Sequence, residues 1–377
     1  MHILIAPNAF KNSLDASSAA TAIAAGFAES KLDCTSFCFP VGDGGDGTGQ
    51  LLTAICGGTF VHETVYDPLG RKIEAAFGLI DEGRTAVIEM ATASGLRLLK
   101  KEELDPLHAS SFGTGQLMLK AMDLRVQKII LCVGGSATVD GGTGILQALG
   151  IRFLDQQGNP LKNMPEGLTD LTAIDMSGLD HRITETECVI LCDVINPLLG
   201  EKGAAKIFGP QKGADAEATV KLEAAMTSFA QIGLQTNGID MTAVFHGGAA
   251  GGTAAGLHSF LQAKTVNGID YFLEITGFDN ALSEATLVIT GEGSIDLQTL
   301  EGKAPYGVAI RAKNKNIPVI ALAGNVPNEQ HPELAACFNK IISINKEPVD
   351  FVTALASTAH NLRRAAYEIG NEWPTAL

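Results

Sequence analysis

Strand and helix patterns alternate at both ends of the chain. An apolar run over residues 2–7 is followed by an Ala-rich helical pattern over about 16–30, a second strand over 36–41 and a helix near 48–55. The same alternation returns after about residue 286. Such alternation predicts strands joined by helices, and therefore a parallel sheet.

The middle of the chain follows a different pattern. Short segments with period-two alternation over 61–66, 73–79 and 86–89 are separated by turns, which predicts an antiparallel meander. An apolar strand over 128–133 and an amphipathic helix over 215–232 follow. We therefore predict two domains.

The predicted boundaries make one domain from both termini. It takes residues 1–58 and 275–377, and an inserted α/β domain with a mixed sheet takes residues 59–274. A chain of 377 residues exceeds the size at which single cores usually stop growing, which favours two cores over one.

Three apolar runs open directly into loops of glycines, small hydroxyl residues and carboxylates. These loops cover residues 42–48, 134–144 and 291–296. Glycine allows positive φ angles and lets a ligand approach main-chain N–H groups, but nearby acids repel a phosphate unless a cation lies between them. The pattern predicts phosphate bound together with Mg²⁺.

The composition limits the classes of molecule that the protein can be expected to bind. Forty-two acidic residues against 27 Lys and Arg give a net charge of -15, which would repel nucleic acids and anionic membranes. We expect small-molecule partners. A site for an anionic substrate would need a cation close to it, from Lys, Arg or a metal. The sequence leaves open whether the chain forms a homo-oligomer. Seven cysteines without a C-x-x-C pair, no leader pattern and no apolar run of about 20 residues predict a cytoplasmic protein.

Three single residues are candidates for chemistry. Lys11 follows the first strand, where it would point toward a crevice, although a solvated loop lysine is the alternative. Asp193 directly follows the apolar run 189–192, so its carboxylate is either satisfied by backbone donors or functional. Lys212 lies in a glycine-rich turn and could reach a phosphate or a carboxylate, but such lysines are more often solvated.

The second and third glycine loops add further candidates. Glu292 and Asp296, with Lys303 shortly after them, form a cluster of acids and a base at a strand end. The alternative for the acids is capping of the next helix. Ser136 and Thr138 place hydroxyl groups beside several N–H donors.

The common catalytic frameworks do not fit. Gly42, Gly44 and Gly47 match the dinucleotide fingerprint, but Asp43 and Asp46 stand where a pyrophosphate must bind. A nicotinamide-dependent hydroxy-acid dehydrogenase is therefore a minor alternative. The chain has no Walker A loop, protein-kinase motif, serine-hydrolase motif or ligand-spaced histidine pair.

Taken together, seven ordered blocks resemble the bacterial glycerate kinases of the first type. The blocks cover residues 5–14, 40–48, 134–142, 192–198, 208–213, 248–252 and 290–296, with sequences IAPNAFKNSL, PVGDGGDGT, GGSATVDGG, CDVINPL, FGPQKG, GAAGG and TGEGSID. The chain departs from the family at three positions: Asn8, Asp46 and Ser294 stand where the family usually has Asp, Glu and Arg.

The resemblance implies two α/β domains, one flavodoxin/Rossmann-like with a parallel sheet and one with a mixed sheet, with the active site in the interdomain cleft. It also implies phosphorylation of D-glycerate by ATP, with 2-phosphoglycerate favoured over 3-phosphoglycerate. A protein that binds or senses a sugar acid without catalysis is the competing hypothesis.

For the implied reaction we assign Asp193 and Lys11 as catalytic residues, and Asp43 and Asp46 to Mg²⁺. Asp193 would accept the proton of the substrate hydroxyl, and Lys11 would neutralise phosphate or the glycerate carboxylate. The residues predicted to bind substrate or phosphate are Gly44, Gly45, Ser136, Thr138, Lys212, Glu292, Asp296 and Lys303.

Overall fold

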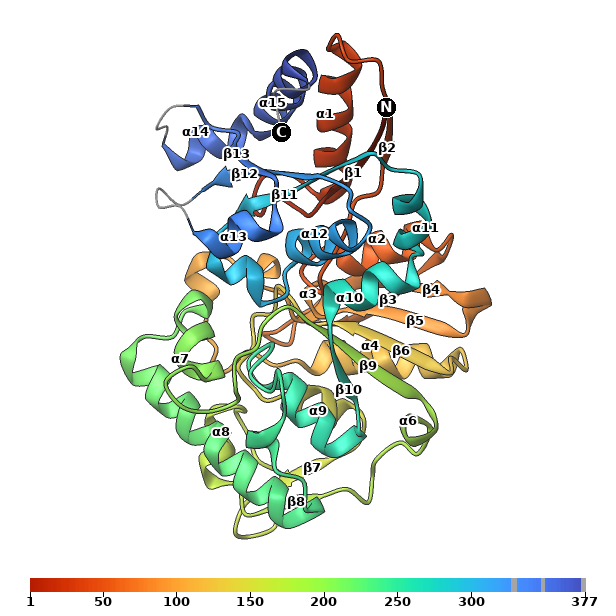
Figure 1. Ribbon diagram of the computed structural model, residues 1–377. Coiled ribbons are helices and arrows are strands. Elements are labelled where there is room, and N and C mark those ends of the chain that lie inside the picture. The colour runs from red at the N-terminus through yellow and green to blue at the C-terminus, as the bar shows by residue number, and fades with distance from the viewer. Residues whose placement is uncertain (327–330, 347–349, 374–377) are drawn as a thin grey trace. The chain divides into compact units, whose positions relative to one another are not determined.

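The computed structural model describes residues 1–326, 331–346 and 350–373 (Figure 1). The chain forms two compact units. The terminal unit comprises Met1–Asp43 and Asn267–Leu377, and the central unit comprises Gly44–Val266. Among the described residues, no helix combines the length and the apolar character needed to cross a membrane.

A parallel sheet forms the middle of the terminal unit. Its strand order is β13-β12-β11-β1-β2, and every neighbouring pair is parallel. The strands are β1 (His2–Pro7), β2 (Thr35–Cys38), β11 (Leu287–Ser294), β12 (Val319–Asn325) and β13 (Lys340–Ser343). The inner strands are almost continuously apolar and buried, as expected of a parallel sheet covered on both faces.

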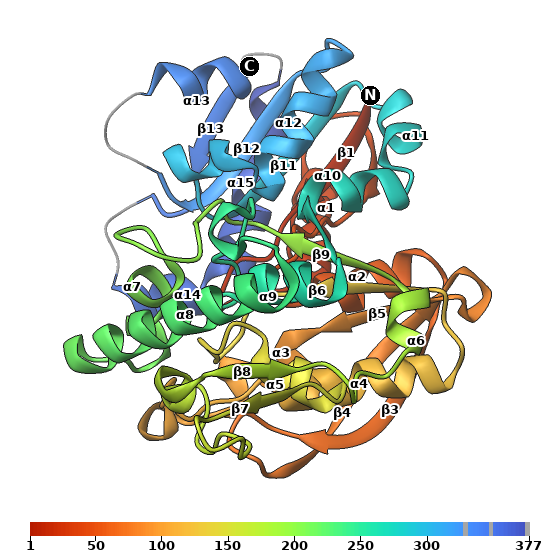
Figure 2. The ribbon, with the colours of Figure 1, turned by 90° about the horizontal axis from the view of Figure 1, so that it is seen from below.

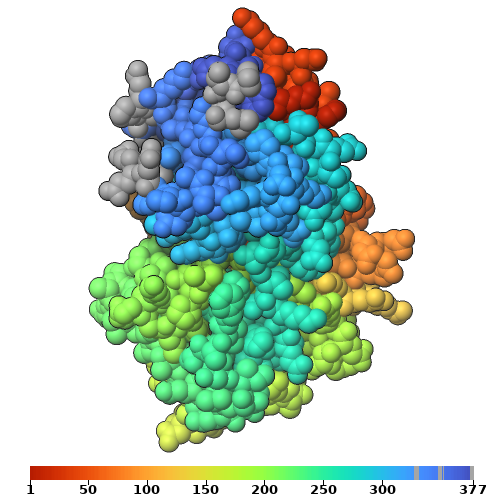
Figure 3. All heavy atoms as spheres, viewed as in Figure 1, coloured from red at the N-terminus to blue at the C-terminus, as the bar shows by residue number. Residues whose placement is uncertain are grey.

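Helices from both ends of the chain cover this sheet. They are α1 (Ala16–Glu29), α10 (Gly268–Ile275), α11 (Phe278–Ser283), α12 (Ala304–Asn314), α13 (Pro332–Cys337), α14 (Phe351–Ala356) and α15 (Thr358–Glu372). Helix α1 packs against α15, so the red N-terminal residues and the dark blue C-terminal residues lie beside each other in Figure 3. Ile23 and Phe27 of α1 share a buried cluster with Leu362 and Ala366 of α15.

A mixed sheet forms the middle of the central unit. Its order is β10-β9-β6-β5-β4-β3, and β7 pairs with β8 separately. The strands are β3 (Thr59–Tyr66), β4 (Lys72–Ile80), β5 (Thr85–Glu89), β6 (Lys128–Cys132), β7 (Arg152–Leu154), β8 (Ala173–Asp175), β9 (Glu187–Cys192) and β10 (Lys264–Asn267).

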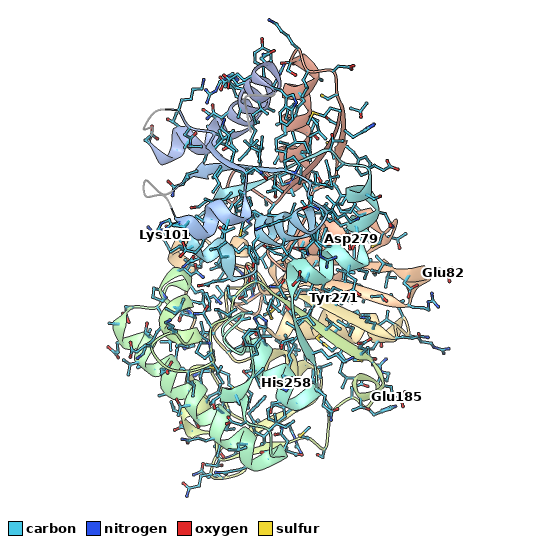
Figure 4. All side chains as sticks on the ribbon, viewed as in Figure 1. Glu82, Lys101, Glu185, His258, Tyr271 and Asp279 are labelled. Carbon is cyan, nitrogen blue, oxygen red and sulfur yellow. The ribbon has the colours of Figure 1, made fainter. Side chains whose placement is uncertain are left out.

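The central sheet contains both kinds of pairing. Strands β3, β4 and β5 form the antiparallel part, and β5, β6 and β9 run parallel (Figure 2). Figure 4 shows Glu82 at the turn between β4 and β5, pointing away from the sheet. The meander and the mixed α/β fold predicted from the sequence are confirmed.

The helices of the central unit vary widely in length. They are α2 (Thr48–Ile55), α3 (Met90–Ser94), α4 (Phe112–Asp123), α5 (Thr143–Ala148), α6 (Arg182–Glu185), α7 (Ala204–Phe208), α8 (Ala216–Asn237) and α9 (Thr253–Leu261). Helix α8 begins at an Asp215 cap and ends at Gly238, whose φ of 78° closes the helix with a left-handed residue.

Seven short 3-10 helices complete the described elements. They are η1 (Asp81–Gly83), η2 (Leu96–Leu98), η3 (Lys101–Glu103), η4 (Glu166–Asp170), η5 (Pro210–Lys212), η6 (Met241–Ala243) and η7 (Leu297–Glu301).

The two units meet along the sequence at different residues from those we predicted. We placed the boundaries at 58 and 275, whereas the units change between Asp43 and Gly44 and between Val266 and Asn267. Packing explains the difference. Helix α2 lies against β4 and β5 of the central unit, and α10 lies against α12 of the terminal unit. A strand-to-helix pattern in the sequence does not indicate which sheet the helix will cover.

Candidate active site

In the terminal unit, the carboxyl ends of β1 and β11 lie side by side. Pro7 of β1 pairs with Gly291 of β11, and the N–H of Asn8 donates to the carbonyl of Gly291 at 2.8 Å. Glu292 is the next residue of β11. Ligands of open α/β sheets bind beyond the carboxyl ends of their strands, so this edge is a candidate site.

Donors from the side chain of Asn8 and the start of α12 hold Asp43 at this edge. The side-chain amide of Asn8 donates to Oδ2 of Asp43 at 2.9 Å, and the N–H of Ala304 donates to the same oxygen at 3.4 Å. Ala304 is the first residue of α12, and a helix N-terminus favours a negative charge. Asp43 is 6% exposed, so its carboxylate is largely shielded from solvent.

Glu292 is the second buried acid of this edge. The hydroxyl of Thr299 donates to its Oε1 at 3.1 Å. The pKa of Glu292 is raised to about 8, chiefly by burial; the negative charges of Asp43 and Asp296 add to this rise, and the positive charge of Lys303 and the hydrogen bond from Thr299 oppose it. At neutral pH the Glu292 carboxyl therefore carries a proton, and a bound cation would favour its ionisation.

The other predicted residues of the terminal unit lie around these acids. Asp296 caps η7, because its Oδ1 accepts from the N–H of Gln298 at 2.9 Å, as the capping alternative predicted. Lys303 stands directly before α12. Lys11 is exposed, and its backbone nitrogen lies 3.6 Å from the position of a Cβ built on Gly293.

In the central unit, the first two glycine loops pack backbone against backbone. The carbonyl of Gly44 accepts from the N–H of Gly134 at 2.9 Å. A Cβ on Gly134 would lie 2.4 Å from the Cα of Gly45, and one on Gly44 would lie 2.6 Å from the carbonyl oxygen of Leu191. These glycines are therefore required by close packing, independently of any ligand.

Asp46 pairs with a residue that the sequence analysis missed. Nε of Arg97 lies 2.9 Å from Oδ2 of Asp46. Arg97 belongs to η2, and the preceding N–H, that of Leu96, donates to the carbonyl of Gly135. Arg97 therefore lies beside both loops. No sequence signal pointed to it, because the contact joins residues about fifty positions apart.

Asp140 occupies the N–H donors at the start of the second loop's helix. Its Oδ2 accepts from the N–H of Ser111 at 2.8 Å, from the hydroxyl of Ser111 at 2.6 Å and from the N–H of Gly144 at 3.2 Å. Its Oδ1 accepts from the N–H of Gly142 at 3.0 Å. The sequence predicted a donor-rich loop here, and two of its N–H groups, those of Gly142 and Gly144, are bonded to the protein's own carboxylate.

Lys212 is buried beside that loop. Its Nζ donates to Oγ of Ser136 at 2.9 Å and to the carbonyl of Thr138 at 2.7 Å, and the residue is 3% exposed. Burial lowers the pKa of Lys212 to about 7, and the negative charge of Asp140 opposes the shift. The solvated-lysine alternative is wrong, because the side chain is buried and its ammonium group bonds to oxygens of the protein.

Thr138 adds a second polar group to this cluster. Its Oγ1 is buried and has no hydrogen-bond partner within the part of the chain that the structure describes. We call Ser136, Thr138 and Lys212 the lysine cluster. One cation and one buried hydroxyl without a partner are groups to which a small anion could bind.

Asp193 directly follows β9, the strand beside β6, and is partly buried. The chain after it is anchored. His246 Nδ1 lies 2.6 Å from the carbonyl of Val194, and the carbonyl of Asn196 accepts from the N–H of Gly248 at 2.9 Å. Asp193 therefore occupies a fixed place at the carboxyl end of a parallel strand.

The metal prediction concerns Asp43 and Asp46. Within residues 1–326, 331–346 and 350–373, no three His, Cys, Asp or Glu residues are grouped to hold a metal ion. Magnesium in kinases is commonly held by one or two carboxylates, with water and substrate phosphates completing the shell, which these two acids fit chemically. Their assignment to Mg²⁺ stays a prediction.

Comparison with known proteins identifies the family. The sequence profile of the Glycerate kinase family matches residues 3–374. A glycerate kinase from Bacillus subtilis is 41% identical, covering 98% of this chain and 97% of the relative. A glycerate 2-kinase from Escherichia coli K12 is 43% identical, covering 87% of this chain and 86% of the relative.

A solved structure agrees with the sequence comparison. A crystal structure from Salmonella typhimurium LT2, assigned as a glycerate kinase 2, superposes with a TM-score of 0.82 at 41% identity. It covers 98% of this chain, and this chain covers 97% of it. The resemblance found in the seven sequence blocks is confirmed, and the chain belongs to the glycerate kinase family.

Proposed function

We propose that this chain transfers the γ-phosphoryl group of ATP to a hydroxyl group of D-glycerate. Membership of a kinase family implies a nucleotide substrate and a small-molecule acceptor. ATP, Mg²⁺ and D-glycerate are the specific assignments of the proposal. The family match favours them over a sugar-acid-binding protein and over a nicotinamide-dependent dehydrogenase.

The observation that carries the proposal is the placement of the charged residues in each unit. In the terminal unit, Glu292 and the residues around Asp43 lie at the carboxyl ends of β1 and β11. In the central unit, Ser136 and Thr138 of the lysine cluster follow β6, and Asp193 follows β9. Lys212 reaches them from η5. Phosphoryl transfer depends mainly on positioning and charge neutralisation, which acids and lysines at strand ends can supply.

Asp193 is the proposed base. As the glycerate oxygen bonds to the γ-phosphorus, the bond from that phosphorus to the oxygen of ADP breaks, and Asp193 takes up the hydroxyl proton. A carboxylate fixed at a strand end can hold the hydroxyl in line for this step. The proton is released to solvent after the product leaves.

The lysines and carboxylates handle charge in this proposal. Lys212 and Lys11 would neutralise the phosphate or the glycerate carboxylate, and Lys303 would act beside Glu292 and Asp43. Mg²⁺, when bound by Asp43 and Asp46, would neutralise the phosphates of ATP. Gly44, Gly45, Ser136, Thr138 and Asp296 remain proposed binding residues.

The proposed product is 2-phosphoglycerate. The relative from Escherichia coli, with 43% identity, is named glycerate 2-kinase. Phosphorus NMR after turnover identifies the phosphorylated oxygen directly, and a 3-phosphoglycerate signal would contradict this assignment.

The test is ADP release from ATP in the presence of Mg²⁺ and D-glycerate. The wild-type chain should release ADP only when both are present. Binding of D-glycerate without ADP release would favour the sugar-acid-binding hypothesis, and a change in nicotinamide absorbance would favour the dehydrogenase.

Substituting Asp193→Asn should lower kcat at least about 100-fold, because the amide cannot accept the hydroxyl proton. The control is Asp170→Asn at an exposed position of η4, which should leave kcat unchanged. Near-normal turnover of the Asp193→Asn variant would remove Asp193 from the mechanism.

A cytoplasmic location is also part of the proposal. Cytoplasmic ATP would supply the phosphoryl donor, and the seven cysteines of the chain are all free thiols.

A further inference from the structure

Glu89 is a buried acid to which neither the sequence analysis nor the proposed reaction assigned a role. It is the last residue of β5, all of whose residues are buried, and it is 5% exposed. An isolated buried carboxylate is costly unless donors surround it. The hydrogen-bond donors around the Glu89 carboxylate therefore indicate its role.

The donors to Glu89 all come from the start of α2. Oε1 accepts from the N–H of Gly49 at 2.5 Å and from the N–H of Gln50 at 3.1 Å. Oε2 accepts from the N–H of Gly47 at 3.3 Å. These N–H groups belong to the residue before the helix and to its second and third residues, which have no acceptor inside the helix.

A glycine loop that opens into a helix commonly binds a phosphate at these same N–H groups. Here the carboxylate of Glu89 already holds them. The fit is close, because a Cβ on Gly49 would lie 2.7 Å from Cγ of Glu89. A phosphate at the start of α2 would therefore meet both occupied donors and a second negative charge.

The same carboxylate fixes the loop before α2. Gly47 has a φ of 90°, and its N–H is one of the groups that Glu89 holds. One residue earlier, Asp46 pairs with Arg97. Burial and the nearby charge of Asp46 raise the pKa of Glu89, while the three N–H donors oppose this shift. Glu89 thus acts on the loop through main-chain hydrogen bonds.

We propose that Glu89 is a positioning residue, whose carboxylate replaces a phosphate at the start of α2 and fixes the loop that presents Asp46. The kinetic test of this proposal rests on the proposed kinase activity, because it measures kcat for D-glycerate. It excludes the first turn of α2 as the phosphate-binding site of the reaction. The substrate phosphates must then be bound by other groups.

Two substitutions of Glu89 test this role. Glu89→Ala removes the acceptor, so kcat should fall at least about 30-fold through misplacement of the loop, while KM for D-glycerate changes less than about threefold. Glu89→Gln keeps an amide oxygen for Gly49 and Gln50, so it should restore kcat to within about fivefold of wild type. Glu82→Ala, at the exposed turn between β4 and β5, is the control.

Added formate gives a readout that a general loss of stability would not produce. A small carboxylate can bind the three vacated N–H groups, so millimolar formate should raise kcat of Glu89→Ala several-fold and leave the wild type unchanged. Normal kcat in Glu89→Ala, or low kcat that neither formate nor Glu89→Gln improves, would overturn the proposal.

Amide hydrogen exchange separates this proposal from the kinase assignment. Exchange at Gly47, Gly49 and Gln50 should accelerate in Glu89→Ala and slow again with formate, whether or not the wild type phosphorylates D-glycerate. Unchanged exchange at these three amides would overturn the role of Glu89 even if the kinase assay succeeds.

Discussion

Glu292 in the terminal unit and Lys212 in the central unit are both buried, and burial shifts their pKa values in opposite directions. Glu292 rises to about 8 and Lys212 falls to about 7. In both cases the neutral form gains, because a charge loses its hydration inside the protein. Burial therefore favours the protonated, neutral carboxyl of Glu292 and the deprotonated, neutral amine of Lys212.

Their neighbours differ as well. Glu292 has two further acids near it, so bound positive charge would stabilise its ionised form. The ammonium group of Lys212 donates to two neutral oxygens. The negative charge of Asp140 acts on it, but the Asp140 carboxylate already accepts four hydrogen bonds. The comparison indicates that the edge of the terminal sheet favours a cation and that the lysine cluster favours an anion.

Within this comparison of Glu292 and Lys212, the largest expected effect comes from removing the lysine. Lys212→Met keeps most of the buried volume but removes the only cation of the lysine cluster, so kcat/KM for D-glycerate should fall about 100-fold, or about 2.7 kcal/mol. Steady-state ADP release measures it. Lys206→Met removes a lysine that pairs with Glu201 at the surface, and this control should stay close to wild type. Equal losses of kcat/KM in both variants would contradict the inference that the lysine cluster favours an anion.

A smaller effect is expected in the pH dependence of stability. Glu292 binds more protons in the folded state, so its contribution is complete below its ordinary pKa of 4.5 and is lost as pH rises through about 8. Lys212 binds fewer protons in the folded state, so its contribution is complete above its ordinary pKa of 10.5 and is lost as pH falls through about 7.

Two variants separate these slopes in urea unfolding experiments. Between pH 5 and 7, Glu292→Gln should remove a fall of about 2 kcal/mol in the free energy of unfolding. Between pH 8 and 10, Lys212→Met should remove a rise of similar size. A variant with the same pH profile as wild type would show that its residue titrates normally.

The smallest expected effect concerns Asn8. Asn8→Asp replaces the amide that donates to Asp43 with a second carboxylate, so stability at pH 7.5 should fall by about 1 kcal/mol. Millimolar Mg²⁺ should restore the melting temperature of this variant more than that of wild type. Asn8→Ser removes the donor without adding charge; an equal response to Mg²⁺ in both variants would contradict the preference for a cation.

Local patterns in the sequence were sufficient to predict much of the fold. Apolar runs with period-two alternation predicted the β3, β4 and β5 meander, and the capping role of Asp296 depends on residues only two and three positions away. The side chains at strand ends were recognisable because apolar runs stop there. Glu89 ends such a run too, and the same signal that selected Asp193 could have found it.

Contacts over long sequence separations could not be predicted in this way. Lys212 reaches Ser136 across 76 positions and Thr138 across 74, so nothing near the turn indicates that the lysine is buried. Ser111, which donates hydrogen bonds to Asp140, lies 29 positions away from it in the sequence. Whether a glycine loop leaves its N–H groups open to a ligand depends on such distant acceptors.

The terminal unit is assembled from the two ends of the chain, and this has a consequence for folding. Strand β1 pairs with β11, and the hydroxyl of Thr290 bonds to the carbonyl of Ala6 across 284 positions. During synthesis the central unit, a continuous segment, can fold before β11 has emerged. Strand β1 can pair with β2 early, but its other edge must wait for β11, and we expect closure of the terminal sheet to be the slow, aggregation-sensitive step.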